Sequence, residues 1–391
     1  MEVKPGYKQT EVGVIPEEWE VKTLSSVSSM KSGEGITASR IDEHSQYPCY
    51  GGNGLRGFTS RYTHDGAFAL IGRQGALCGN VLGVSGKLFA SEHAVVVTPR
   101  QGTNIQFLTF VLGEMHLNRL SEASAQPGLS VSKILQLSIA TPQTEAEQRA
   151  IATALSDVDG LLGGLDRLIA KKRDLKQAAM QRLLTGQTRL PGFHSEWEVK
   201  RLDALADIRS GGTPSTGEPR FWDGDIPWCT PTDITALNGH KYLGETARMI
   251  TQLGLKASSA EMIPAHSVVM TSRATIGECA INAVPVSTNQ GFKNFIPFAT
   301  TNVDFLYYLL GTQKQGFISL CGGSTFLEIG KTQLVAYQVR LPATKAEQTA
   351  IAAVLTEMDG ELAVLTQRRE KTRALKQAMM QELLTGKTRL I

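Results

Sequence analysis

The stretch QTEAEQRAIATALSDVDGLLGGLDRLIAKKRDLKQAAMQRLLTGQTRL at residues 143–190 decides the fold, because it returns without a gap, with more than half of its positions identical, at the end of the chain. The second copy, ATKAEQTAIAAVLTEMDGELAVLTQRREKTRALKQAMMQELLTGKTRL, spans residues 343–390. Each copy opens with the capping-box pattern Thr-x-x-Glu, at Thr144 and at Thr344, and closes on a glycine at a C′-like position. Each copy therefore predicts a complete helix of roughly 40 residues, about 60 Å long at 1.5 Å per residue.

Apolar residues within each copy are spaced alternately by four and three positions, which is the spacing of a coiled-coil seam. An amphipathic helix packed on a globular core is the alternative explanation. Length favours the coiled coil, because globular helices usually have about three turns. The residues of this series are Ile151, Leu155, Val158, Leu162, Leu165 and Ile169 in the first copy and Ile351, Leu355, Met358, Leu362 and Leu365 in the second.

The repeat extends beyond the helices, since the pattern EWEVKxL at residues 18–24 returns at residues 196–202. In each half, short β-like runs alternate with turns rich in Gly, Pro and Asn, and one helical segment follows late. The sequence therefore predicts an α+β protein in which two mixed α/β domains are joined by two long helices. The expected boundaries are residues 1–143 and 187–343 for the domains and 144–186 and 344–391 for the helices.

The two ends of the chain look like one interrupted segment. Residues 13–19, GVIPEEW, resemble the continuation that the first helix has and the last helix lacks, so the sequence reads as a closed ring cut once. A pseudo-twofold that relates the halves requires the two long helices to run antiparallel. We therefore expect Ile391 to lie within about 25 Å of the segment around Gly13, less than half of one helix length.

Composition places the chain among ordinary globular proteins. Its 391 residues are 41% hydrophobic, and no run of 18 apolar residues could span a membrane. With no apolar signal segment at the start, we expect a soluble cytoplasmic protein without membrane contact. The net charge of +3 does not by itself indicate a nucleic-acid binder. The five cysteines lack metal-ligand or redox spacing, so we expect reduced thiols and no metal site.

Three short motifs of enzymes occur in the wrong context. GNGLRG at residues 52–57 fits a dinucleotide-binding loop, but a strand-like run follows it in place of a helix. DIPW at residues 225–228 approximates a signature of amino-methyltransferases without its first proline, and no glycine-rich cofactor loop accompanies it. ExK at residues 20–22 and 198–200 matches half of a nuclease metal centre. We predict no catalytic residue and no resident cofactor in this chain.

Polar clusters bounded by glycines are the better candidates for function, because loops of this kind on a rigid scaffold often read a ligand. Arg can fork onto guanine, Asn and Gln onto adenine, and Ser or Thr onto phosphate. Arg73 and Arg273 form the best matched pair, since both follow an apolar strand; the alternative for any one side chain is a structural role. The predicted DNA-binding residues are Asn53, Arg56, Arg73, Gln74, Thr213, Ser215, Ser272, Arg273, Asn289, Gln290 and Lys293.

Several phrases together resemble one known family. They are IGRQGALCGNV (71–81), GGTPSTGEPRFWDGDIPWCTPTDI (211–234), STNQGFKNFIP (287–297), and PQTEAEQRAIATALSDVD and LKQAMMQELLTGKTRL in the repeated helices. With them the chain resembles the specificity subunit of type I restriction-modification systems. The resemblance implies two target-recognition domains, each reading one half of a split double-stranded DNA site, separated by two antiparallel conserved helices that act as a ruler.

The resemblance also implies partners. The helices are expected to dock two methyltransferase subunits, the assembly to recruit two restriction subunits, and S-adenosylmethionine, ATP and Mg to be bound by those partners. The helix residues assigned to partner contact are Ile151, Leu155, Leu162, Leu175, Ile351, Leu355, Leu362 and Leu375. Basic segments at 170–174 and 368–373, where the heptads break, are further candidates for partner or DNA-backbone contact.

Because the loops of the two domains differ, we predict an asymmetric target. Two other functions stay open at this stage. One is a methyltransferase or nuclease in its own right, and the other is a coiled-coil adaptor that reads no bases.

Overall fold

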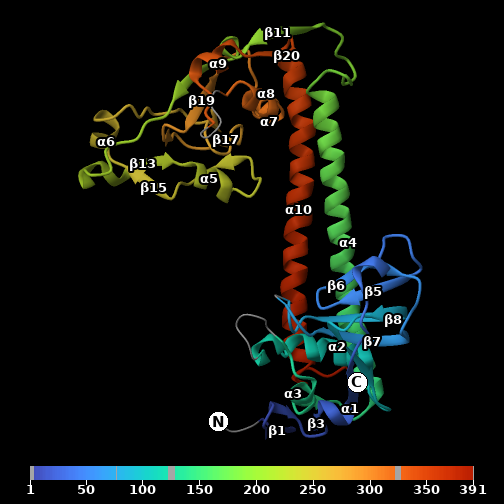
Figure 1. The fold of residues 1–391 in the computed structure, drawn as a ribbon. Helices are drawn as coiled ribbons and strands as arrows, with labels where there is room; N and C mark the ends of the chain where they lie inside the picture. The colour runs from blue at the N-terminus through green and yellow to red at the C-terminus, as the bar shows by residue number, and fades with distance from the viewer. Residues whose placement is uncertain (1–3, 76, 122–127, 322–326, 391) are drawn as a thin grey trace. The chain divides into compact units, whose positions relative to one another are not determined.

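A computed structural model describes residues 4–75, 77–121, 128–321 and 327–390. Its two longest elements are the helices α4 (Glu145–Leu183) and α10 (Lys345–Leu383), each of 39 residues and drawn as unbroken ribbons in Figure 1. Both are followed by a glycine in the left-handed conformation, Gly186 at φ 74° and Gly386 at φ 72°. The predicted helices and their glycine stops are therefore present.

The capping boxes are only half formed. The Thr144 hydroxyl accepts a hydrogen bond from the Glu147 backbone N–H at 3.3 Å, and Thr344 caps α10 in the same way. The Glu147 side chain does not turn back to the helix start, because its carboxylate accepts hydrogen bonds from the indole of Trp19 and from Arg389. The sequence pattern thus marked the helix starts correctly but assigned the glutamate to the wrong partner.

The chain divides into two compact units whose boundaries lie inside the long helices. Unit 1 comprises residues 1–166 and 367–391, and unit 2 comprises residues 167–366. Each unit therefore holds one mixed domain, the first part of the helix that follows it, and the last part of the other long helix. The expected boundaries at the helix starts do not separate the units, since each domain packs on the first turns of its own helix.

In unit 1 the two helix segments run antiparallel. Asp159 of α4 pairs with Lys376 of α10 at 2.7 Å, and Asp166 pairs with Arg369 at 2.8 Å. Residue numbers thus rise along α4 as they fall along α10.

Unit 2 has the same arrangement with the roles of the helices exchanged. Lys172 of α4 pairs with Glu361 of α10 at 2.6 Å, and Lys176 pairs with Asp359. The predicted antiparallel direction therefore holds within each unit.

The domain of unit 1 is built on a six-stranded mixed sheet, and one helix packs against its strands β7 (His64–Gly72), β8 (Val81–Ala90) and β9 (Ala94–Pro99). The sheet order is β4 (Ser28–Ser32), β9, β7, β8, β5 (Tyr47–Gly51) and β6 (Gly54–Thr59). Helix α2 (Ile105–Glu114) starts at Asn104, whose side chain accepts from the Phe107 N–H at 2.9 Å. Its buried face packs Phe107, Leu108 and Leu112 into the core of unit 1.

The domain of unit 2 contains two smaller sheets. The first has the order β12 (Ala206–Ser210), β19 (Phe292–Pro297), β16 (Val268–Thr271), β17 (Cys279–Asn282) and β14 (Tyr242–Leu243). The second has the order β15 (Arg248–Ile250), β13 (Trp222–Cys229) and β18 (Ser287–Thr288). Helix α7 (Val303–Thr312) corresponds to α2 and starts at Asn302, which caps the N–H of Phe305 at 2.9 Å.

Short elements complete the two units. The strand pairs are β1 (Tyr7–Thr10) with β2 (Gly13–Pro16), β3 (Glu20–Thr23) with β10 (Ser138–Thr141), and β11 (Trp197–Arg201) with β20 (Gln338–Pro342). The short helices are α1 (Leu24–Val27), α3 (Val131–Leu135), α5 (Pro231–Ala236), α6 (Gln252–Lys256), α8 (Lys314–Ser319) and α9 (Lys331–Ala336), with 3₁₀ turns at Ala38–Arg40, Leu117–Leu120, Leu202–Ala204 and Pro219–Phe221. The mixed sheets and long helices confirm the predicted α+β class. None of the helices in the described ranges is long and apolar enough to cross a membrane.

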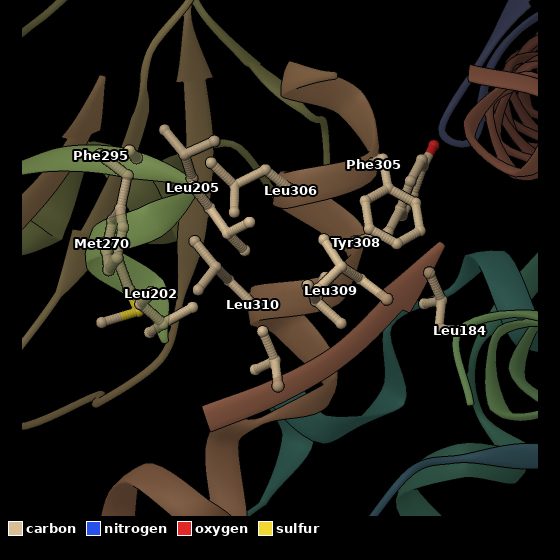
Figure 2. Close-up of a cluster of buried hydrophobic side chains, with 14 of the residues drawn as sticks. Leu184, Leu202, Leu205, Met270, Phe295, Phe305, Leu306, Tyr308, Leu309 and Leu310 are labelled. Carbon is tan, nitrogen blue, oxygen red and sulfur yellow. The ribbon is translucent and has the colours of Figure 1, made fainter. Parts of the chain in front are cut away.

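The core of unit 2 shows what holds a domain to its helices. Figure 2 shows Phe305, Leu306, Leu309 and Leu310 of α7 grouped with side chains from the strands and connecting turns. The same cluster includes Leu184, which directly follows α4, and Ile351 and Leu355 from the first turns of α10. Burying side chains of this size contributes about 1.5–3 kcal/mol each. Helix ends and domain therefore form one hydrophobic core.

Four of the eight helix residues assigned to partner contact are corrected by this packing. Ile151, Leu155 and Leu355 are 0% exposed and Ile351 is 1% exposed, all inside the core of their own unit. Heptad spacing gives an apolar face without indicating what covers it, and here the mixed domain of the same unit covers the first three turns. Leu162 and Leu362 are half-buried, whereas Leu175 and Leu375 are exposed.

The expected closure of the ring concerns Ile391, which lies outside the described residues. The residues just before it pack on the N-terminal segment of the same unit. The Tyr7 hydroxyl donates to the Lys387 carbonyl at 3.1 Å, and Arg389 pairs with Glu18. The end of α10 thus meets residues 7–19 as the end of α4 meets the segment around Trp197.

Candidate nucleic-acid interface

Three polar loops of unit 2, far apart in the sequence, meet at one place. The Gly212 N–H donates to the Thr288 carbonyl at 2.9 Å, and the Ser272 N–H donates to the Gly291 carbonyl at 2.7 Å. The Thr213 hydroxyl bonds to the Gln290 side chain. A Cβ on Gly211 would lie 1.9 Å from the Asn289 carbonyl oxygen, so this approach of two loops requires glycine. We call this group of loops, residues 211–215, 271–274 and 287–293, the unit 2 loop cluster.

The unit 2 loop cluster exposes some of the predicted side chains and partly covers others. Ser215, Arg273 and Gln290 are exposed, and Thr213 and Asn289 are half-buried. The Asn289 side-chain oxygen accepts from the Gly291 N–H at 2.9 Å, so it also shapes its own loop. Arg273 and Gln290 are therefore the residues of this cluster best able to reach a base edge.

Two of the residues predicted to contact DNA in this cluster are buried in the structure. Ser272 is 0% exposed and Lys293 is 5% exposed. The Lys293 ammonium points into the protein, where it donates to the Phe292 carbonyl at 3.4 Å and to the Ser272 hydroxyl at 3.5 Å. Burial lowers the pKa of Lys293, and the nearby carboxylate of Glu328 partly opposes this effect. Both faces of this part of β19 are buried, which the spacing of the sequence does not reveal.

Glu328 contacts the unit 2 loop cluster, and the sequence did not indicate it. Its carboxylate forms an ion pair with Arg273 at 2.8 Å and lies 3.9 Å from the Lys293 ammonium. An isolated backbone bridge also joins Arg273 to Glu328. No motif surrounds this glutamate, so only the fold reveals the pairing.

Unit 1 brings its own predicted loops together in the same way. The Arg73 N–H donates to the His93 carbonyl at 2.9 Å, and the Arg73 guanidinium donates to the Ser32 hydroxyl at 3.0 Å. The Gln74 side-chain oxygen lies 3.1 Å from the His93 ring nitrogen. A Cβ on Gly72 would lie 2.3 Å from the Gly52 carbonyl oxygen. We call residues 51–56, 72–75 and 91–94 the unit 1 loop cluster.

The side chains of the unit 1 loop cluster are more open. Asn53, Arg56 and Gln74 are exposed, and Arg73 is half-buried. The segment 91–94 was not predicted as part of the site, although it is the counterpart of residues 289–292 by strand pairing. That match was detectable only from the register of the sheet.

Strand register shows that Arg73 and Arg273 do not occupy equivalent positions in the two units, contrary to the prediction. In unit 1, Ile71 pairs with Val95; in unit 2, Met270 pairs with Lys293.

The backbone bonds agree with the shifted match. The N–H groups of Arg73 and Ser272 donate to the matched carbonyls of His93 and Gly291. The next residues, Gln74 and Arg273, each form an isolated bridge, to Gly128 and to Glu328 respectively. Arg73 therefore matches Ser272, and Gln74 matches Arg273.

The enzyme-like motifs lie in or beside strands. GNGLRG at 52–57 enters strand β6, and DIPW at 225–228 lies in strand β13 with Trp228 buried. The glutamate and lysine of each ExK pair with each other, at 2.9 Å for Glu20 and Lys22. Among the residues that the structure describes, no group of His, Cys, Asp and Glu is arranged to hold a metal ion. All five cysteines are free thiols, and burial raises the pKa of each of them.

Comparison with known proteins gives a consistent result. The model of the type I restriction modification DNA specificity domain matches residues 16–169 and 194–372. The specificity subunit of the type I restriction enzyme EcoprrI of Escherichia coli is 44% identical over 148 residues, which span 37% of each chain. The putative MjaX specificity subunit of Methanocaldococcus jannaschii is 24% identical over 98% of this chain and 97% of its own length.

Solved structures agree at the level of the fold. The crystal structure of a type I restriction-modification system S subunit from M. genitalium superposes with a TM-score of 0.66, covering 98% of both chains at 16% identity. A chain from a study of complex assembly and conformational transition of the type I R-M system gives a TM-score of 0.58, with 96% of this chain covered at 16% identity.

Proposed function

The chain belongs to the family of type I restriction-modification DNA specificity proteins, and from this premise we propose that it is a non-catalytic subunit that reads a bipartite, asymmetric DNA site. Each loop cluster reads one half of the site. The observation that carries the proposal is that two domains present loop clusters of matched backbone register with different side chains. Gln74 stands in unit 1 where Arg273 stands in unit 2.

The chemistry of these two side chains supports different half-sites. Arg forms two parallel hydrogen bonds with the O6 and N7 of guanine, and Gln does the same with the N6 and N7 of adenine. Arg273 therefore reads a guanine in the half-site of unit 2, and Gln74 reads an adenine in that of unit 1. Asn53 and Arg56 in unit 1 and Gln290 in unit 2 supply further contacts to bases or phosphates.

The long helices set the spacing between the half-sites and dock two methyltransferase subunits, and the assembly recruits two restriction subunits. S-adenosylmethionine, ATP and Mg are bound by those partners in this proposal. The exposed leucines Leu175 and Leu375 support a docking role, since large apolar side chains left on a helix surface are common at interfaces. The basic segments contribute less, because Lys172 and Arg369 already pair with acidic side chains of the other long helix.

A domain exchange tests the proposal. Residues 25–142 are replaced by the corresponding region of a relative, and the chain is expressed with its methyltransferase partner. Sequencing that detects methylated bases is expected to show one changed half-site and one unchanged half-site. An unchanged motif would favour an adaptor that reads no bases. Methyl transfer to DNA by the purified chain alone would show that it is itself an enzyme.

A further inference from the structure

Unit 2 completes its sheet with a short strand that has no counterpart among the described residues of unit 1. Strand β14 lies parallel to β17. The Ile281 N–H donates to the Lys241 carbonyl at 2.9 Å, and the Ala283 N–H donates to the Leu243 carbonyl at 2.8 Å. The outer edge of β17 is therefore paired at these positions.

The side chain of Lys241 is buried between this strand and the helices α7 and α10. It is only 7% exposed, and its ammonium donates to Asp304 of α7 at 2.7 Å and to Thr356 of α10 at 2.9 Å. The same ammonium lies 5.3 Å from the ring centroid of Tyr308. One lysine thus connects the sheet, α7 and α10.

The corresponding sheet edge of unit 1 is open. Gly83 of β8 pairs with Ala69 of β7, and at the matched position of unit 2 Ile281 of β17 pairs with Val268 of β16. Gly83 and Ser85 therefore match Ile281 and Ala283, and their N–H groups point away from β7 toward the outer edge. Strand β5 pairs with β8 only at Phe89 and Ala90. In the described part of unit 1, no other strand pairs with this outer edge at residues 81–85, and Gly83 and Ser85 are exposed.

A cleft of about 700 Å³ lies beside this open edge, entirely within unit 1. Its lining includes Gln106 and Phe110 of α2 and Ser156 of α4. Helices α2 and α7 can be aligned at their caps, Asn104 and Asn302. Gln106 and Phe110 then match Asp304 and Tyr308. The repeat of the long helices matches Ser156 with Thr356. The cleft is therefore lined by the counterparts of all three groups that surround Lys241 in unit 2.

The difference has a simple origin in chain length. Tyr50 and Cys229 are matched, because the N–H groups of Ser91 and Asn289 donate to their carbonyls. The segment from there to the next matched strand covers residues 51–63 in unit 1 and residues 230–262 in unit 2. The longer segment supplies α5, β14, β15 and α6. Unit 1 has no comparable length of chain with which to fill its own cleft.

We infer that the β8 edge and its cleft in unit 1 bind an extended segment of the partner methyltransferase subunit, which adds to the sheet as β14 does in unit 2. This inference rests on the proposed function for the identity of the partner. The segment runs parallel to β8, accepts hydrogen bonds from the N–H groups of Gly83 and Ser85, and places a lysine or another donor side chain among Gln106, Phe110 and Ser156. Unit 2 supplies the template for this occupant, and strand addition to an open edge is a common form of peptide recognition.

A peptide that copies β14 tests the binding site directly. The probe is NGHKYLGET, residues 238–246, added to the full chain, and it is expected to bind with one site per chain. Ser85→Pro removes an outward N–H without touching the pairing with β7 and is expected to weaken binding about tenfold, since one hydrogen bond is worth about 1 kcal/mol or slightly more. Ser85→Ala, which keeps the N–H, is the matched control and is expected to bind normally.

Two further changes probe the cleft itself. A peptide with Lys241→Ala is expected to bind at least about tenfold more weakly, because it loses the contacts of the buried ammonium. Gln106→Lys in the chain places a positive charge at the position that matches Asp304 and is expected to reduce binding by repelling the peptide lysine, even where Ser85→Pro fails to fold. Equal binding of the peptide to the original chain and to both variants overturns the site.

Amide hydrogen exchange in the assembled complex tests the partner. The amides of Gly83 and Ser85 are expected to exchange more slowly in the complex with the methyltransferase subunits than in the chain alone. A complex that forms without this protection overturns the inference and leaves the proposed function intact. A failure of the complex to form overturns the proposed function, and the peptide assay then still decides whether the edge is a binding site.

Discussion

Arg389 donates two hydrogen bonds to the buried carboxylate of Glu147, from Nε to Oε1 at 2.8 Å and from Nη2 to Oε2 at 2.9 Å. This fork joins the segment after α10 to the first turn of α4 inside unit 1. The indole of Trp19 donates to the same carboxylate at 3.3 Å. Unit 2 repeats the arrangement with Arg189, Glu347 and Trp197, at 2.6 and 2.8 Å for the arginine. Each unit thus ties the end of one long helix to the start of the other.

Breaking this fork should destabilise unit 1. Arg389→Met leaves the Glu147 carboxylate, which is 3% exposed, with only the Trp19 indole as donor, and removing one partner of a buried ion pair costs about 3–5 kcal/mol. Thermal unfolding and amide exchange are expected to show the loss in residues of unit 1. The double variant Arg389→Met with Glu147→Gln should recover part of the stability, because it leaves no buried charge. A double variant as unstable as the sum of both single changes would contradict this account.

The matched positions Gln74 and Arg273 should control one base pair each. Gln74→Arg is expected to change the preference of the unit 1 half-site from adenine to guanine at one position, and one bidentate contact discriminates by about 1–3 kcal/mol. Arg273→Gln is the reciprocal change and should alter only the half-site of unit 2. Methylation motifs determined for each variant check the prediction. A motif unchanged in both variants would show that these residues do not read bases.

Much of the fold could be predicted because its signals are local and repeated. The helix starts, the glycine stops and the order of strands and helices all follow from turn residues and apolar spacing. The packing partner of an apolar face could not be predicted in this way. Ile151 and Leu155 have the spacing of a coiled coil, yet the mixed domain of unit 1 packs over them. Periodicity shows that a face is buried, and it does not show by what.

The candidate sites were predicted in part. The loops that contain Thr213, Ser272 and Gln290 do come together, because glycines on both sides allow close approach. Lys293 was assigned to DNA because it belongs to a polar cluster bounded by glycine, and the burial of both faces of its strand could not be read from the sequence. Glu328 carries no motif, and the match of Gln74 with Arg273 depends on strand register, which the different loop lengths of the two domains conceal.

Lys293 should contribute nothing to DNA binding and should cost stability at neutral pH. Burial lowers its pKa below the ordinary value of 10.5, so the folded state disfavours the charged form. This cost is present below the folded pKa and disappears as pH rises past the unfolded pKa. Lys293→Met is therefore expected to be equally stable or about 1 kcal/mol more stable at pH 7, with the difference shrinking toward pH 10. Unfolding curves at both pH values check the sign, and an altered methylation motif would contradict the placement of this residue inside the protein.

Lengthening both helices at one level should change the spacer of the DNA site and leave its half-sites alone. Asp166 pairs with Arg369, so insertions between Arg167 and Leu168 and between Gln367 and Arg368 enter the antiparallel pair at nearly the same height. These points lie one residue from the boundaries of the two units, at 166/167 and 366/367, so neither insertion enters a mixed domain. Seven residues in each helix preserve the heptad and add about 10 Å.

At about 3.4 Å per base pair this length corresponds to about three base pairs of spacer. Sequencing of methylated DNA is expected to show the original half-sites separated by a correspondingly longer gap. An insertion in α4 alone is the control: it leaves α10 without a matching segment and should abolish methylation, because the two helices can no longer pair along their length. If the matched insertions support methylation with an unchanged spacer, the helices do not set the distance between the half-sites.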